Sequence, residues 1–149
     1  MEKPSIIVFY RGGWCPFCNT HLGQLASSQD QLAALGYQII AISVDKPEKL
    51  QESINKINLK YQLLSDSKAE ASKAFGIAFK VEDSLVDKYK SQYNIDLEAD
   101  SGEKHHILPV PAVFVVGKDG IISFQHVNPN YQVRLDPEIL LAAAKAGLK

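Results

Sequence analysis

The sequence predicts a single α/β domain, residues 1–149, with a mixed central sheet and its chemistry at the carboxyl end of the first strand. Apolar runs typical of strands alternate with segments of helical periodicity along the first half of the chain. Two further apolar runs near the carboxyl terminus surround a turn sequence. The only two cysteines form a CxxC motif, Cys15-Pro16-Phe17-Cys18, which follows the first strand.

The first strand and the first helix enclose the cysteines. Ile6 to Tyr10 is a continuous apolar run, as expected of a strand buried on both faces. Gly12-Gly13 ends this run, and Pro16 suits the first turn of a helix, which places Cys15 near the N-cap. Apolar residues at helical spacing then continue to a cap at Gly36: Leu22, Leu25, Ala26, Leu32 and Ala33.

Two more strand–helix units follow. Residues 37–44 form the second strand, and Asp45 and Pro47 are the expected cap and first-turn proline of the next helix. After a short strand at 61–64, Ser67 opens a third helix as part of a capping box. Alternating strands and helices of this kind predict a parallel sheet with right-handed crossovers.

The segment 77–108 interrupts this alternation. Residues 84–93 carry a helical stripe, whereas residues 96–106 are polar and loop-like. A long connection of this type is either a lid or binding loop, or a solvated excursion. Residues 113–117 and 121–127 then predict an antiparallel hairpin at one edge of the sheet, and Asp136 begins a final helix.

Composition excludes several classes of protein. Hydrophobic residues make up 46%, charged residues 22%, and the formal net charge is −1, which gives no electrostatic basis for binding nucleic acid or an anionic membrane. The apolar runs are too short to span a bilayer, and no signal peptide is visible. Two closely spaced cysteines in such a chain indicate a catalytic or metal-binding pair in the cytoplasm.

The position of the CxxC favours thiol redox chemistry. Unpaired N–H groups and the macrodipole at a helix N-terminus stabilise a thiolate, the nucleophilic form of cysteine. Cys15 is therefore the expected attacking thiol, and Cys18, one turn further, the resolving thiol. Arg11 either adds positive charge near the thiolate or points into solvent. Trp14 is either a packing residue or a wall facing the substrate.

Two other readings of the cysteines are weaker. A zinc site lacks a second CxxC, so His21 would need to combine with His105 and His106 from the polar loop. The cysteines are otherwise inert core residues, although the flanking glycine, tryptophan and proline argue against this. We expect neither a metal nor a cofactor.

The order of the motifs resembles a known family. FYRGGWCPFCNTHLGQL, IIAISVDKPEK, LLSDSKAEASKAFGI and VPAVFVVGKDGII together resemble the alkyl hydroperoxide reductase/thiol-specific antioxidant family, in a peroxiredoxin-like branch with a CxxC. The resemblance covers nearly the whole chain. It implies a thioredoxin-like three-layer sandwich with helices on both faces, and a cis-proline at Pro111, after Val110, that faces the active site.

The sequence departs from the family pattern at three places. Gly12 stands where typical members have a threonine or serine three residues before the reactive cysteine. Their catalytic arginine follows the last hairpin strand; residues 121–127 contain none, and Arg134 lies outside the matching position. The family's N-terminal hairpin is also missing, which leaves an edge less covered and favours a homodimer.

Three functions follow for such a protein. The resemblance favours an oxidoreductase that reduces hydroperoxides through Cys15 and Cys18 and is regenerated by an external thiol donor such as a thioredoxin or glutathione system. The CxxC and Gly12 favour a thioredoxin-like reductase of protein disulfides. A non-catalytic binding module would use the groove near Trp14, Phe17 and Pro111.

Overall fold

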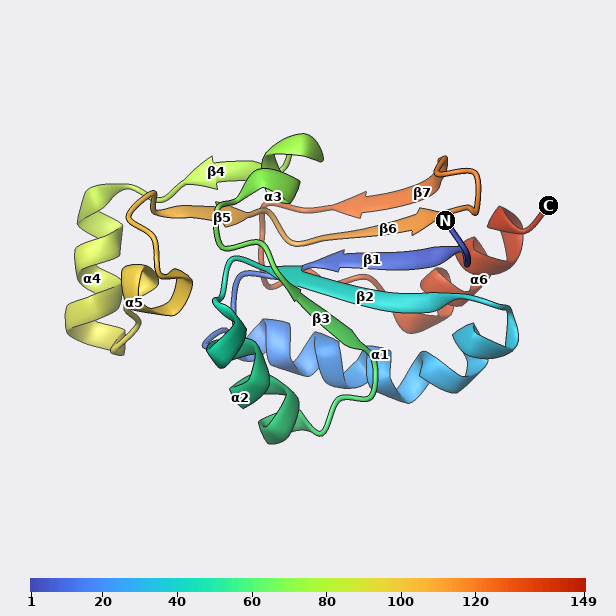
Figure 1. Ribbon diagram of the computed structural model, residues 1–149, viewed down its shortest axis with the longest axis horizontal. Helices are drawn as coiled ribbons and strands as arrows, with labels where there is room; N and C mark the ends of the chain where they lie inside the picture. Colours follow the sequence, from blue (N-terminus) through green and yellow to red (C-terminus); the bar gives the residue numbers. More distant parts are fainter.

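A five-stranded mixed sheet forms the centre of the computed structural model, which describes residues 1–149 (Figure 1). Its strand order is β3-β2-β1-β6-β7. β1 is parallel to β2 and β2 to β3, whereas β6 runs antiparallel to β1 and β7 antiparallel to β6. The predicted parallel units and edge hairpin are thus confirmed. The strands are β1 (Ser5–Phe9), β2 (Gln38–Ser43), β3 (Gln62–Ser65), β6 (Ala112–Val116) and β7 (Ile122–Val127).

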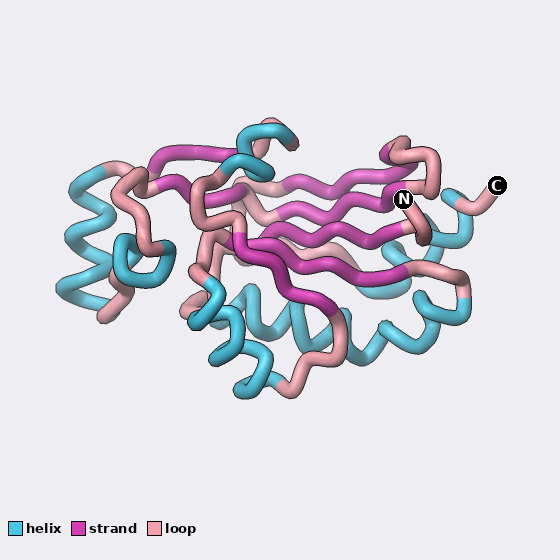
Figure 2. Tube along the Cα trace, in the orientation of Figure 1, coloured by secondary structure: helices cyan, strands magenta, loops and turns pink.

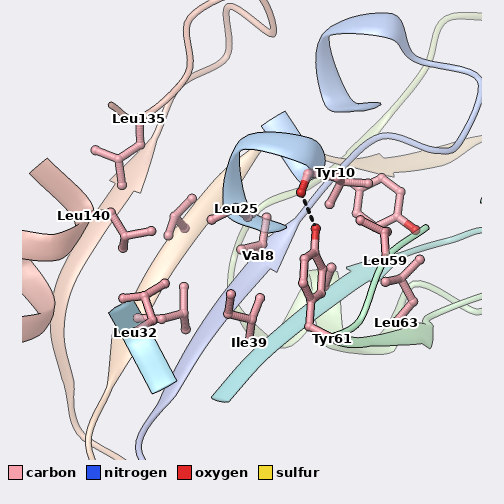
Figure 3. Close-up of a cluster of buried hydrophobic side chains, with 14 of the residues drawn as sticks. Val8, Tyr10, Leu25, Leu32, Ile39, Leu59, Tyr61, Leu63, Leu135 and Leu140 are labelled. Atoms are coloured by element: carbon pink, nitrogen blue, oxygen red, sulfur yellow. Dashed lines mark hydrogen bonds between the residues drawn. The ribbon is translucent and has the colours of Figure 1, made fainter. Parts of the chain in front are cut away.

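Three helices cover one face of this sheet (Figure 1): α1 (Pro16–Ala34), α2 (Pro47–Ile57) and α6 (Pro137–Gly147). They bury the larger core against the inward-facing residues of β1, β2 and β6, such as Val8, Ile39 and Val113. Figure 3 shows Leu25, Leu32 and Leu140 converging on Val8 and Ile39. Within this core Tyr61 donates a 2.7 Å hydrogen bond to the carbonyl oxygen of Leu22, which ties the approach to β3 to α1.

A short helix, α3 (Glu70–Ala74), lies on the opposite face and completes the three layers. Here Phe9 and Phe114 of the sheet pack against Phe75, with ring centroids 5.0 Å apart for Phe9–Phe75 and 4.9 Å for Phe75–Phe114. Aromatic pairs at this spacing add stabilisation beyond the area they bury. The predicted three-layer sandwich is confirmed.

The insertion 77–108 forms a small unit of its own beside the sheet (Figure 2). β4 (Ala78–Lys80) pairs antiparallel with β5 (Ile107–Pro109), and between them lie α4 (Asp83–Tyr93) and α5 (Leu97–Ser101). Val81, Leu97 and Leu108 are buried in its core. The helix expected at residues 84–93 is confirmed. The loop expected at 96–106 is wrong in part, because Asp96 caps α5 by accepting the N–H of Ala99.

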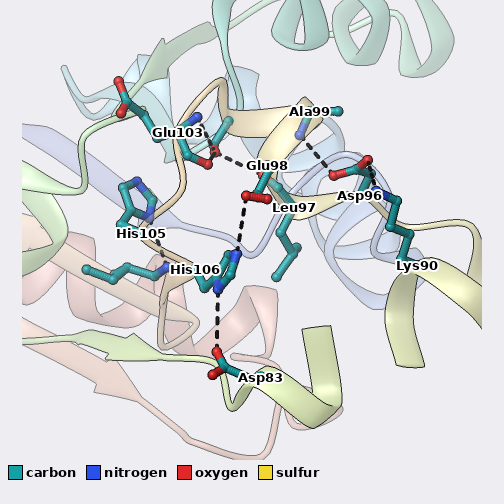
Figure 4. Close-up of polar contacts among 11 residues, drawn as sticks. Asp83, Lys90, Asp96, Leu97, Glu98, Ala99, Glu103, His105 and His106 are labelled. Atoms are coloured by element: carbon teal, nitrogen blue, oxygen red, sulfur yellow. Dashed lines mark hydrogen bonds and ion pairs between the residues drawn. The ribbon is translucent and has the colours of Figure 1, made fainter. Parts of the chain in front are cut away.

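His106 joins the two helices of the insertion (Figure 4). Its Nδ1 lies 3.8 Å from Asp83 Oδ1 and its Nε2 lies 3.7 Å from Glu98 Oε1. His105 instead binds the carbonyl oxygen of Ser67 through Nε2, at 2.6 Å. His106 is thus occupied within the insertion and His105 by the segment before it, so the structure does not bring either histidine to the cysteines.

Two predicted helix caps are wrong. α2 begins after Lys46, which makes no side-chain cap, because the Asp45 carboxylate turns inward to accept the N–H of Gly13. α3 begins after Ala69 rather than Ser67. There the carboxylate of Asp66 accepts the N–H groups of Ala71 and Ser72, at 2.9 Å each. Both aspartates bind N–H groups that local sequence patterns did not identify.

The cis-proline predicted at Pro111 is also wrong, because the chain contains no cis peptide bond. The extended connection from β5 to β6 is held on both sides of this proline. Val110 N–H donates to the carbonyl oxygen of Ile77, and the carbonyl oxygen of Pro111 accepts from Asn128 N–H. An all-trans backbone satisfies both bonds. Among the six helices, none is both long and apolar enough to cross a membrane.

Candidate active site

Cys15 is the N-cap of α1, as the sequence predicted. Its backbone is extended, with φ −90° and ψ 112°, and Pro16 occupies the first turn. Cys15 Sγ accepts the N–H of Cys18 at 3.3 Å. This places the sulfur where the free N–H groups of the helix point, the position at which a negative charge is best stabilised. Both cysteines are free thiols and are buried.

Arg134 lies against both sulfur atoms. Its Nη2 is 3.2 Å from Cys18 Sγ and 4.0 Å from Cys15 Sγ. Arg134 lies outside the family's matching position in sequence, yet the structure brings its guanidinium to the cysteines. The sheet topology explains this contact. β7 runs parallel to β1, so the segment after β7 begins at the same end of the sheet as the CxxC after β1. Spacing within the motif could not show this.

Arg11 points inward rather than into solvent. Its guanidinium carbon lies 4.4 Å from the ring centroid of Tyr131 and 5.0 Å from that of Trp14, and its Nη2 donates a 2.6 Å hydrogen bond to the hydroxyl of Tyr89. Cation–π contacts of this kind hold a guanidinium in place. Neither Arg11 nor Arg134 forms an ion pair with a carboxylate, so both charges act on the cysteines.

These contacts separate the two thiols. The hydrogen bond from the Cys18 thiol, the Cys18 N–H and the charges of Arg11 and Arg134 together lower the pKa of Cys15 to about 6, although burial opposes the shift. Burial, followed by the adjacent Cys15, raises the pKa of Cys18 well above its usual range. Cys15 is thus the thiolate at neutral pH and Cys18 the protonated partner, as the roles inferred from sequence require.

The glycine pair before the motif is explained by its neighbours. A Cβ atom at Gly12 would lie 2.8 Å from Cδ1 of Trp14, so the indole occupies the space that a larger residue needs. Gly13 is fixed from both sides, because its N–H donates to Asp45 Oδ2 at 2.8 Å and its carbonyl accepts from Asn19 Nδ2 at 2.8 Å. Burial raises the pKa of Asp45 to about 6.

A cleft of about 510 Å³ opens beside Cys15. We call it the aromatic cleft, because eight of its eleven lining residues are hydrophobic and most of these are aromatic. Trp14, Pro16 and Phe17 form the wall nearest the motif, and the remaining wall comes from α4 and from Tyr131. Phe17 meets Tyr131 edge to face at 5.6 Å. Trp14 therefore both packs and faces the cleft.

Other predicted site residues lie elsewhere. Val110 packs beside Phe9 and Phe114, and neither it nor Pro111 lines the cleft. His21 is buried in α1, and burial, followed by the charge of Arg134, lowers its pKa to about 4. No three residues among histidines, cysteines, aspartates and glutamates converge in a geometry for metal binding.

The sheet topology and the CxxC at the N-terminus of α1 define a protein of the thioredoxin-fold class. Solved structures share this fold: Enterococcus faecalis AhpC superposes with a TM-score of 0.75 at 19% identity, covering 99% of this chain and 76% of that one. Peroxiredoxin Q of Xanthomonas campestris gives a TM-score of 0.75 at 17% identity, over 99% and 81%. The AhpC/TSA family model matches residues 1–125, so the chain belongs to this family.

Sequence relatives cover a shorter region. A putative peroxiredoxin bcp of Haemophilus influenzae is 36% identical over 75 residues, 50% of this chain and 48% of the relative. Peroxiredoxin Bcp of Escherichia coli is 33% identical over 72 residues, 48% of this chain and 46% of the relative. The match thus spans about half the length of these curated relatives, and it supports the family assignment made from the motifs.

Proposed function

We propose that the protein is a thiol-dependent peroxidase in which Cys15 reduces a hydroperoxide and Cys18 resolves the product. The observation that carries the proposal is the environment of Cys15 Sγ, which accepts the Cys18 N–H at 3.3 Å and has Arg134 Nη2 at 4.0 Å. A thiolate held by donors that also reach the reacting oxygens is the arrangement that peroxide reduction needs.

The reaction uses the two cysteines, the hydroperoxide and an external thiol donor. The Cys15 thiolate attacks the terminal oxygen of ROOH, an S–O bond forms, the O–O bond breaks, and the departing RO⁻ takes a proton to give ROH. The sulfenic acid of Cys15 then reacts with the Cys18 thiol to give a disulfide and water. Two external thiols, or one dithiol, reduce this disulfide and leave as their own disulfide.

Arg134 supplies a hydrogen-bond donor at the thiols, where the CxxC segment of this chain has Gly12 in place of the family's hydroxyl. Gly12 provides no hydroxyl for the peroxide, and Trp14 occupies the space where one would stand. The Arg134 guanidinium, with several N–H donors and no carboxylate partner, is placed to stabilise the negative charge that develops on the leaving oxygen. We therefore assign to Arg134 the role of the family's catalytic arginine.

The alternatives fit the site less well. A protein disulfide must reach the attacking sulfur, but Cys15 is only 2% exposed and is approached through the aromatic cleft, which suits a small molecule. A non-catalytic binding module gives no reason for two uncompensated arginines beside the thiols. The setting we propose is the reducing cytoplasm, with a thioredoxin- or glutathione-type donor as the external thiol.

Single-turnover oxidation of the reduced protein tests the proposal. We expect hydrogen peroxide or an organic hydroperoxide to form one intramolecular disulfide in the wild type, read as the loss of two hydrogens by mass spectrometry. Cys18→Ser should stop at a sulfenic acid that a dione reagent traps, and Cys15→Ser should not react. Reduction of insulin disulfides serves as the comparison.

Three results bear on the outcome. A wild type that reacts with peroxide no faster than free cysteine, yet exchanges quickly with insulin, would establish the reductase instead. Arg134→Met should slow the peroxide step by roughly tenfold to a hundredfold, since one preorganised donor is removed. Arg134→Lys, which keeps the charge but loses the planar fork, should lie between Arg134→Met and the wild type.

A further inference from the structure

The walls of the aromatic cleft carry two positive side chains and no carboxylate, so a positive charge remains beyond the one that faces the Cys15 thiolate. Two of its eleven lining residues are cationic, Arg11 and Lys88, and none is acidic. Neither of them forms an ion pair with a carboxylate anywhere in the chain. An apolar cleft with an unbalanced positive charge is complementary to a molecule with an apolar body and a negative group.

The two cations lie in different surroundings. Arg11 is 7% exposed, held between Trp14 and Tyr131, and it contributes to the low pKa of Cys15. Lys88 is exposed and lies on α4, three residues after Leu85, and Tyr89 follows four residues after Leu85. Leu85, Lys88 and Tyr89 therefore share one face of that helix. The buried charge of Arg11 lies near the reacting sulfur, and the exposed charge of Lys88 lies on the α4 side of the cleft, which we call its outer rim.

The apolar body of a ligand would lie between these positions. Trp14 and Tyr89 pack with ring centroids 5.9 Å apart, and Tyr89 and Tyr93 with centroids 6.4 Å apart. These rings line the cleft from the CxxC to α4. Flat aromatic walls of this kind bury the carbon skeleton of a ligand.

We propose that the preferred substrate is a hydroperoxide whose apolar carbon skeleton carries a carboxylate. This inference rests on the proposed peroxidase function. The hydroperoxide group reaches Cys15, the carbon skeleton lies along the aromatic walls, and the carboxylate is held by Lys88 at the rim. The covalent steps are those given above, since the carboxylate keeps its charge and takes no part in the transfer of oxygen.

Matched substrates and matched variants test this assignment. Cumene hydroperoxide bearing a para carboxylate and its methyl ester differ only in the charged group. Trp14 is the only tryptophan and lies beside Cys15, so its fluorescence can report single-turnover oxidation without a reductant. Lys88→Gln and Lys88→Glu alter the rim charge. Lys90→Gln, on the same helix but outside the cleft, is the control; its ion pair with Asp96 is exposed and worth little.

In the wild type at low ionic strength we expect the carboxylate substrate to react about threefold to tenfold faster than the ester. This is the size of effect expected from the exposed charge of Lys88 together with the buried charge of Arg11. Lys88→Gln should remove most of this preference and Lys88→Glu should reverse it, each read as the ratio of the carboxylate rate to the ester rate. Added salt should weaken the preference, and Lys90→Gln should keep it.

The outcomes separate this inference from the proposed function. Equal rates for the two substrates in the wild type, or a preference that survives in Lys88→Glu, would overturn the carboxylate assignment while leaving the peroxidase intact. Failure to oxidise Cys15 with either substrate would overturn the peroxidase itself.

Discussion

The Cys18 thiol, one backbone N–H and two arginines without carboxylate partners lower the pKa of Cys15 and so set its reactivity. Arg134 and Arg11 stand near its sulfur, and neither is neutralised by a carboxylate. Cys18, one turn away, is held as a thiol by burial and by its charged neighbour. The same pair of residues thus contains a nucleophile and a proton-bearing partner, a division of roles that follows from their surroundings and not from their residue type.

The pH dependence of alkylation measures this effect. Because the thiolate is the reactive form, the rate of Cys15 alkylation should rise with a midpoint near pH 6. Arg134→Met removes a positive charge that favours the thiolate, so the midpoint should rise by roughly half a unit to one unit. Arg134→Lys, which keeps the charge, is the control. An unchanged midpoint in Arg134→Met would contradict the electrostatic role.

Gly12 shows how one neighbour excludes a family residue. The family's hydroxyl cannot be restored by substitution, because a Cβ at this position would meet the Trp14 indole. Gly12→Ser should therefore destabilise the protein by about 1–3 kcal/mol and slow peroxide reduction. Urea denaturation followed by circular dichroism measures the change, because Trp14, the only tryptophan, is itself replaced in one of the variants. Combining Gly12→Ser with Trp14→Ala should relieve the clash; a purely additive effect of the two changes would argue against it.

Among the elements, α1 carries the reactive cysteine at its N-terminus and, further along, a glycine that lowers its stability. Gly23 lies within this helix, and a Cβ there would meet nothing within 4 Å. The close packing that such a glycine can permit is therefore not its role. Gly36, just after the helix, has φ +90°, a backbone conformation that glycine adopts at least cost.

These two glycines form a matched pair. Gly23→Ala should raise the free energy of unfolding by about 0.5–1 kcal/mol, since alanine restricts the unfolded chain and favours the helix. Gly36→Ala should lower it by about 1 kcal/mol, because its Cβ strains a left-handed residue. Thermal or urea unfolding of the reduced proteins gives both values. A loss of stability in Gly23→Ala would show that this position needs glycine.

The role of the insertion, segment 77–108, could not be read from the order of the elements along the chain. Its helix α4 supplies the second wall of the aromatic cleft, and its own core includes Val44 and Ala69 from the main domain. Of the two readings left open for segment 77–108, a binding element agrees with this placement better than a solvated excursion. Tyr89 contributes most directly, because it both hydrogen-bonds Arg11 and packs against Trp14.

For the whole molecule, the open question is how the sheet edge at β7 is covered. Ile122 and Val127 on this edge strand are 43% and 41% exposed. Exposed apolar edge strands invite pairing with another chain. The homodimer expected from sequence would form most simply by antiparallel pairing of two β7 strands, which would bury these side chains together.

Sedimentation of the reduced protein tests the dimer. The wild type should sediment as a dimer, and Ile122→Lys should sediment as a monomer with an unchanged circular dichroism spectrum, because the charge opposes pairing at the edge. Ile139→Lys is the matched control, since Ile139 is 53% exposed and lies on α6 and not on the edge strand. A wild type that remains monomeric at high concentration would rule out this interface.

The sequence by itself determined the main sheet, its order of elements and the position of Cys15 at the start of α1. Apolar runs such as Ile6–Tyr10 and the capping position of Cys15 are local signals, and local signals carry through to the folded chain. The family assignment followed from the same stretches. The expected caps at Asp45 and Ser67 failed for two different reasons. The Asp45 carboxylate accepts the distant N–H of Gly13, and Asp66 accepts the first N–H groups of α3 in place of Ser67.

Only the tertiary structure decided which distant residues meet the thiols. Arg134 lies 119 positions from Cys15, yet its guanidinium is placed there by the return of β7 parallel to β1. The inward position of Arg11 depends on Tyr89 and Tyr131, from two other segments. Charge near a thiolate depends on distance in space, and sequence spacing gives that distance only within one helix or one turn.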